Sequence, residues 1–308
     1  MDIFLQQLIN GLVLGSVYAL VALGYTMVYG ILELINFAHG EVTMMGAMVS
    51  LAVISALLGS AVALPLVLIL ILGLLAAMLV CMALGFVIER VAYRPLRKAP
   101  RLAPLITAIG VSIVLQSVAM MTWGKQYIPF PIALPNTRHE IGGAAITDIQ
   151  IIIISVSCTL MLALLLLVNK TRFGRAMRAT AQAPEVAGLM GVNVNTVISL
   201  TFVLGSALAA VAGVLISAYY VTHYYMGFML GLKAFSAAVL GGIGNITGAV
   251  LGGLLLGVIE SLGAGYLAQL THGLMGSHYQ DVLAFFVLIL VLIFRPSGLL
   301  GERVAERA

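Results

Sequence analysis

Stretches of about 20 consecutive, mainly apolar residues recur along this chain and leave little choice of fold. A helix needs about 20 such residues to cross the hydrocarbon core of a bilayer. Charged residues make up only 8% of the chain, whereas soluble domains contain about 25%. The sequence therefore predicts an all-α polytopic membrane protein in which residues 1–308 form a single transmembrane domain.

The apolar stretches fall at six places, followed by a glycine-rich region and a last apolar run. Their approximate ranges are 5–30, 41–59, 62–88, 102–123, 148–168, 197–219, 227–267 and 281–294. We expect the glycine-rich region to form two antiparallel pieces around Gly241–Gly248, since both of its ends have to lie on the same side. This gives eight or nine membrane segments, some of them incomplete helices.

Basic residues are concentrated in three places, which orients the chain. Twelve of the fifteen basic residues lie in clusters at 90–101, 170–178 and 295–307. Loops on the cytoplasmic side carry an excess of Lys and Arg, so we expect all three clusters to be cytoplasmic. The C-terminus then lies inside and the N-terminus outside. Glu89 directly precedes the first cluster, and we expect it to be a charge neighbour of Arg90 or Arg94.

Polar residues interrupt the apolar pattern at two sites that follow membrane segments. The first holds Asn36, His39 and Glu41, and the second holds Asn245 within Gly241–Gly248. Interrupted segments at corresponding places in two halves of a transporter point to its transport path. We therefore expect these residues to lie near the path and infer an internal repeat. Ordinary turns between packed helices are an equally good interpretation of each site.

Two charges, Lys233 and Glu260, lie inside the glycine-rich region. They are 12 residues before and 15 residues after Asn245, so at about 1.5 Å per residue they reach a similar depth. Charges within a membrane segment are costly and usually pair or mark a path. We expect the two to pair, directly or through water, and assign both to the transport path. Two unrelated residues facing polar cavities remain the alternative.

Residues 169–196 form a long polar loop between two apolar segments and carry Lys170, Arg172, Arg175 and Arg178. Glu185, Val186 and Ala187, followed by Gly191, match the spacing of the E-A-A-x-x-x-G motif of ABC importer permeases, with valine in place of the first alanine. Such a loop forms a short helix that docks in a groove of a partner. A solvated interfacial helix with its basic residues on anionic lipid is the other interpretation.

Several motifs occur in order along the chain. They are Gly11–Leu20, Gly24–Gly30, Ile35–Glu41, Glu89–Pro95, Phe235–Gly244 and Arg295–Gly301. Together they resemble the permeases of high-affinity branched-chain amino acid ABC importers, and the length resembles the shorter of the two permeases that such importers pair. The resemblance covers nearly the whole chain.

The resemblance implies a bacterial inner-membrane importer of leucine, isoleucine and valine. This chain would pair with a homologous, longer permease and two cytoplasmic ATPases, and a periplasmic amino-acid-binding protein would deliver the substrate. The partner ATPases hydrolyse ATP, so the resemblance implies no cofactor and no enzymatic activity in this chain. We also expect contact with membrane lipid and none with nucleic acid.

Two other functions stay open at the level of sequence. Importers of urea or short-chain amides use related permeases, and an ion-coupled secondary transporter would need intramembrane carboxylates or histidines. Among the carboxylates and histidines of this chain, Glu260 is the one well placed to bind a coupling ion.

Overall fold

The computed structural model describes residues 2–60, 64–97, 99–100, 102–132, 134, 136–270 and 279–301. Within these ranges seven helices are long and apolar enough to cross a membrane, and two shorter apolar helices accompany them. The prediction of an all-α polytopic membrane protein with eight or nine segments is confirmed.

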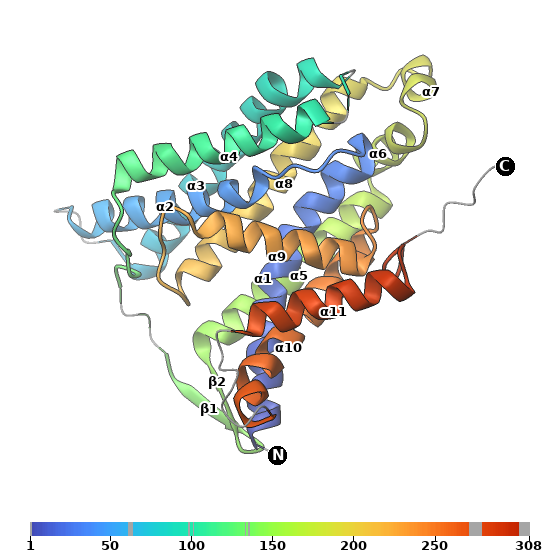
Figure 1. Ribbon diagram of the computed structural model, residues 1–308. Helices are drawn as coiled ribbons and strands as arrows, with labels where there is room; N and C mark the ends of the chain where they lie inside the picture. Colours follow the sequence, from blue (N-terminus) through green and yellow to red (C-terminus); the bar gives the residue numbers. More distant parts are fainter. Residues whose placement is uncertain are drawn as a thin grey trace. The chain divides into compact units, whose positions relative to one another are not determined.

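The helices follow the predicted order closely. They are α1 (Asp2–Leu32), α2 (His39–Leu58), α3 (Leu66–Ile88), α4 (Leu102–Trp123), α5 (Asp148–Lys170), α6 (Arg172–Gln182), α7 (Pro184–Leu189), α8 (Val194–Ser217), α9 (Met226–Gly241), α10 (Ile246–Leu270) and α11 (Gln280–Phe294). A π-helical turn, η1 (Glu89–Tyr93), and a 3₁₀ turn, η2 (Arg94–Leu96), extend α3. Figure 1 labels most of these elements.

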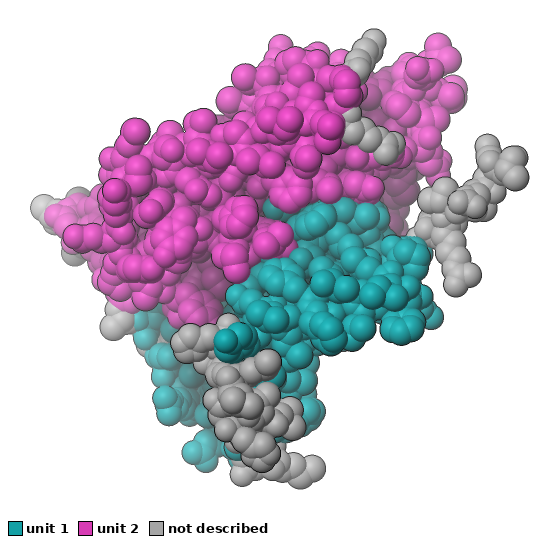
Figure 2. Space-filling view, in the orientation of Figure 1, with its two compact units in different colours: residues 1–26, 134–162, 233–308 teal, residues 27–133, 163–232 magenta. Residues whose placement is uncertain are grey.

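The chain divides into two compact units, which Figure 2 colours separately. Unit 1 contains residues 1–26, 134–162 and 233–308, and unit 2 contains residues 27–133 and 163–232. Helices α1, α5 and α9 therefore each contribute to both units. Each unit is described by itself below.

Unit 2 is built on α2, α3, α4 and α8, which share one apolar core. Its buried side chains include Met44, Met48, Tyr93 and Phe202. Small residues bring α2 and α8 close together, because a methyl group on Gly46 would lie 2.7 Å from the Cα of Ala210. Dispersion contacts normally lie at about 3.5–4.0 Å, so the crossing requires glycine.

Unit 1 packs α1 against α10 through a similar stripe of small residues. A methyl on Gly11 would lie 2.6 Å from the Cα of Val258, and one on Gly253 would lie 2.6 Å from the Cα of Ala19. Gly252, on another face of α10, abuts the carbonyl of Ala237 in α9. Close backbone approach of this kind drives helix association where hydrophobicity cannot.

Helices α9 and α10 form the antiparallel pair expected from the glycine-rich region. Gly241 and Gly248 touch across the connecting turn, and the left-handed conformation of Gly242 (φ +107°) and Gly244 (φ +93°) reverses the chain. The predicted pieces around Gly241–Gly248 are thus confirmed.

A β-hairpin in the polar loop before α5 was not expected. Strand β1 (Arg138–Ile141) pairs antiparallel with β2 (Ala144–Thr147). Gly142 (φ +58°) and Gly143 (φ +87°) supply the two positive φ angles that a tight two-residue hairpin turn requires.

Candidate functional site

The polar loop folds as two short helices, α6 and α7, within unit 2. The chain breaks at Ala183, which adopts φ −153° and ψ 88°. A residue before proline is disfavoured in the helical region, so Pro184 ends α6 and starts α7. The predicted short docking helix corresponds to α7.

Helix α7 presents an apolar tip outward. Val186, Leu189 and Met190 are 57%, 87% and 80% exposed, whereas Ala187 is buried. Their i, i+3 and i+4 spacing places the three exposed side chains on one face. Glu185 and Val186 are exposed as a docking role requires, and Ala187 instead anchors the helix. Sequence reasoning missed Leu189 and Met190, although their spacing from Val186 was a usable signal.

Gly191 ends α7 in a left-handed conformation (φ +85°). The amide of Gly191 donates to the carbonyl of Gly188 at 3.0 Å, and the amide of Val192 donates to the carbonyl of Ala187 at 3.0 Å. Glycine is the usual residue at this position after a helix, because it carries no Cβ. Gly191 therefore fixes the direction in which the chain leaves the apolar tip.

Helix α6 is fixed to the end of α5. The side chain of Thr171 accepts from the amide of Gly174 at 3.1 Å, and Gly174 lies directly against the carbonyl of Val168. Arg178 donates to that same carbonyl. Arg178 is exposed overall, but its bond to the Val168 carbonyl joins α6 to the end of α5.

Glu89 is fully buried in unit 2, and its partner differs from the predicted one. It forms an ion pair with Arg97 and accepts from the hydroxyl of Ser199 at 2.6 Å. The expectation of Arg90 or Arg94 was wrong, because the π and 3₁₀ turns after Ile88 bring Arg97 back towards Glu89. Burial lowers the pKa of the Arg97 guanidinium from its usual value.

The first polar interruption lies between α1 and α2, as predicted. The hydroxyl of Tyr93 donates to the side chain of Asn36 at 3.0 Å. His39 begins α2, and both His39 and Glu41 are buried.

Glu41 sits in a polar pocket of its own within unit 2. One carboxylate oxygen accepts from Ser112 at 3.1 Å and from Gln116 at 2.6 Å, both on α4. The other oxygen, Oε2, lies against Gly227 at the start of α9, and no residue that the structure describes hydrogen-bonds to it. The carboxylate thus keeps one acceptor for a further donor.

The predicted pairing of Lys233 with Glu260 is confirmed in unit 1. The ammonium lies 2.7 Å from Glu260 and 2.8 Å from Asp281, and the hydroxyl of Tyr18 donates to Glu260 at 2.9 Å. Lys233 is 12% exposed and Glu260 is 3% exposed. This cluster connects α1, α9, α10 and α11. Sequence reasoning did not find Tyr18 or Asp281, because no local spacing relates them to Lys233.

Asn245 begins α10 and makes local contacts. Its side chain accepts from the amide of Gly248 at 2.9 Å and donates to the carbonyl of Leu300 at 2.9 Å. These bonds cap the helix and tie the segment after α11 to the turn. They give Asn245 a structural role, and its place in a transport path stays a prediction.

The predicted path residues thus fall into separate groups. Asn36, His39 and Glu41 belong to unit 2, whereas Lys233, Asn245 and Glu260 belong to unit 1. Within unit 1, Lys233 and Glu260 are in contact, and Asn245 bonds elsewhere.

Known proteins resemble this chain over almost its whole length. The family described as branched-chain amino acid transport system / permease component matches residues 7–292. The high-affinity branched-chain amino acid transport system permease protein LivH of Salmonella typhimurium is 48% identical over 310 residues, covering 99% of this chain and 97% of the relative. The corresponding permease BraD of Pseudomonas aeruginosa is 48% identical, covering 99% and 98%. A probable branched-chain amino acid transport permease of Methanocaldococcus jannaschii is 29% identical over 302 residues, covering 97% and 94%.

Proposed function

This chain belongs to the branched-chain amino acid transport permease family, and from this membership we propose that it carries leucine, isoleucine and valine inward as a permease subunit of an ABC importer. The observation that carries the proposal is 48% identity, over 99% of the chain, to permeases named for high-affinity branched-chain amino acid transport.

The importer needs partners, and α7 provides the surface for one of them. We propose that α7 docks in a groove of a cytoplasmic ATPase, with Val186, Leu189 and Met190 as the buried contact and Ala187 as the internal anchor. The exposure of three apolar side chains on one face of a polar loop supports this role. A second ATPase would dock on a homologous, longer permease, and a periplasmic amino-acid-binding protein would supply the substrate.

The orientation follows from the basic clusters. With residues 90–101 and 170–178 inside, α7 faces the cytoplasm and the N-terminus lies on the periplasmic side of the bacterial inner membrane. Glu41 is the strongest candidate residue of the substrate path, because one buried carboxylate oxygen is available to the ammonium group of an amino acid.

Transport in reconstituted vesicles tests the function. The chain is reconstituted with the longer permease and the ATPases, the binding protein is added outside, and uptake of labelled leucine is measured with ATP inside. We expect leucine uptake that requires ATP and the binding protein, and no uptake of labelled urea or acetamide.

The alternatives give different results in the same assay. Uptake driven by a proton or sodium gradient without ATPases would replace the proposal with an ion-coupled transporter. Binding of urea or acetamide by the cognate periplasmic protein, without binding of leucine, would reassign the substrate and leave the ATP-driven mechanism in place.

A further inference from the structure

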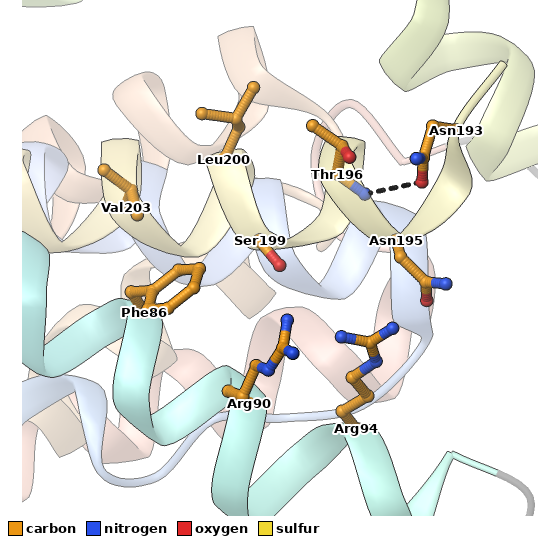
Figure 3. Close-up of a pocket in the computed structure, with 9 residues that line it drawn as sticks. All are labelled: Phe86, Arg90, Arg94, Asn193, Asn195, Thr196, Ser199, Leu200 and Val203. Carbon is orange, nitrogen blue, oxygen red and sulfur yellow. Dashed lines mark hydrogen bonds between the residues drawn. The ribbon is translucent and has the colours of Figure 1, made fainter.

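A pocket of about 330 Å³ opens in unit 2 between the end of α3 and the start of α8 (Figure 3). The function proposed above makes no use of it. It lies where two helices reach the basic cluster at 90–101, and its lining changes character along its length.

The wall from α3 becomes polar over two helical turns. Phe86 lies in α3, Arg90 in η1 and Arg94 in η2, so the three side chains line the pocket one after another towards the end of the segment. An aromatic ring therefore stands nearer the middle of the membrane segment, and two guanidinium groups follow towards its end. Figure 3 shows both guanidinium groups directed towards α8.

The wall from α8 shows the same gradient in the opposite chain direction. Val203 and Leu200 line the apolar end, and Ser199, Thr196 and Asn195 follow towards the start of the helix. The two walls thus match at each level: apolar beside apolar, and hydrogen-bonding groups beside guanidinium groups.

Arg90 and Arg94 bring two positive charges to the pocket. Among the residues that the structure describes, neither Arg90 nor Arg94 has a carboxylate within 4.0 Å. Glu89 is engaged by Arg97 and Ser199. The side-chain oxygen of Asn195 accepts from Arg97 at 2.7 Å. The amide nitrogen of Asn195 is therefore the group that can donate to a ligand. The polar end of the pocket is therefore cationic and rich in donors.

We propose that this pocket binds one anionic phospholipid from the cytoplasmic leaflet. The phosphate lies between the guanidinium groups of Arg90 and Arg94, which suit bidentate phosphate binding, and the amide of Asn195 donates to it. The first part of an acyl chain passes Phe86, Leu200 and Val203. Charge complementarity selects an anionic headgroup, and the change from polar to apolar lining selects a lipid over a free anion.

The orientation of the pocket fits this occupant. Basic pockets between membrane helices on the cytoplasmic side are places where anionic headgroups bind. The basic clusters that orient the chain place this pocket at that side, and the inference uses this orientation but does not depend on which solute is transported.

Native mass spectrometry of the purified chain in detergent tests the inference. The probes are phosphatidylglycerol and phosphatidylethanolamine with identical acyl chains, and inorganic phosphate as competitor. We expect phosphatidylglycerol to bind more tightly than phosphatidylethanolamine. Each of Arg90→Gln and Arg94→Gln should weaken phosphatidylglycerol binding about fivefold. Arg94→Lys keeps the charge but loses the bidentate fork, so it should weaken binding less than Arg94→Gln does.

The matched control is Arg175→Gln, which removes an exposed arginine of α6 from the same side of the chain. It should leave phosphatidylglycerol binding unchanged. Equal binding of the two lipids, or equal losses in Arg90→Gln and in the control, would overturn the inference. Displacement of the lipid by inorganic phosphate would also overturn it, because the site would then be one for a free anion. If the glutamine variants elute as aggregates, Val203→Asn tests the apolar end and should weaken lipid binding.

Discussion

Replacing Leu189 by alanine is expected to weaken docking of the ATPase without affecting the stability of the permease. The side chain is 87% exposed in the isolated chain, so its removal costs the fold almost nothing, and alanine favours a helix. The substitution removes three carbons, each contributing about 0.8 kcal/mol when buried. If docking buries the exposed part, the loss is about 2 kcal/mol, which corresponds to about 30-fold weaker association.

The assay compares two quantities on the same preparations. Association of the purified ATPase with the permease in nanodiscs gives the dissociation constant, and thermal unfolding gives the stability of the permease. The matched control is Leu162→Ala, because Leu162 is 61% exposed but lies on membrane helix α5. An unchanged dissociation constant in Leu189→Ala, or equal losses in both variants, would refute the assignment of α7 as the docking helix.

Three further outcomes follow from the geometry. Lys233→Met should reduce stability and transport, and the double variant with Glu260→Gln should recover part of both, since it removes the carboxylate left beside an apolar side chain. Gly253→Leu should force α1 and α10 apart and lower the melting temperature, at a cost of about 1–3 kcal/mol or more, whereas Gly110→Leu should not, because nothing lies within 4 Å of its added Cβ. Gly191→Val should impose a strain of about 1–2 kcal/mol at a left-handed position, reducing co-purification of the ATPases while the membrane helices keep their stability.

Each of these has an outcome that contradicts it. A double variant no better than Lys233→Met alone would show that the pair contributes no coupling, and equal melting temperatures of the two leucine variants would rule out the close crossing as a constraint. Gly188→Val is the control for Gly191→Val, since it places valine on the face of α7 opposite the apolar tip. Equal co-purification in these two variants would show that the left-handed turn is not needed.

The number and order of the membrane helices could be predicted, because they depend on the length of the apolar runs. The turn at Gly241–Gly248 followed from the requirement that both ends of the glycine-rich region lie on the same side. The pairing of Lys233 with Glu260 followed from counting depth, which works for adjacent antiparallel segments. Asp281 was missed because its approach depends on how α11 packs, and sequence spacing carries no such information.

Local departures from regular helix were the other features that the sequence did not predict. The predicted partner of Glu89 was wrong, because a π turn followed by a 3₁₀ turn changes the direction of side chains within a few residues. The hairpin at Gly142-Gly143 had a signal in its two glycines, but the flanking strands are only four residues each and show little alternation. The exposed tip of α7 could have been predicted from the spacing of Val186 and Leu189.

The charge cluster around Lys233 also sets an order for the biogenesis of the protein. Helix α9 has 16 residues and carries a lysine, whose insertion alone costs about 2.5–3.5 kcal/mol at a helix centre. Glu260 pairs with this lysine and balances its charge, and it is synthesised 27 residues later. We therefore expect α9 to insert more readily together with α10, after Glu260 has been synthesised, because the salt bridge then offsets part of the cost of burying the lysine.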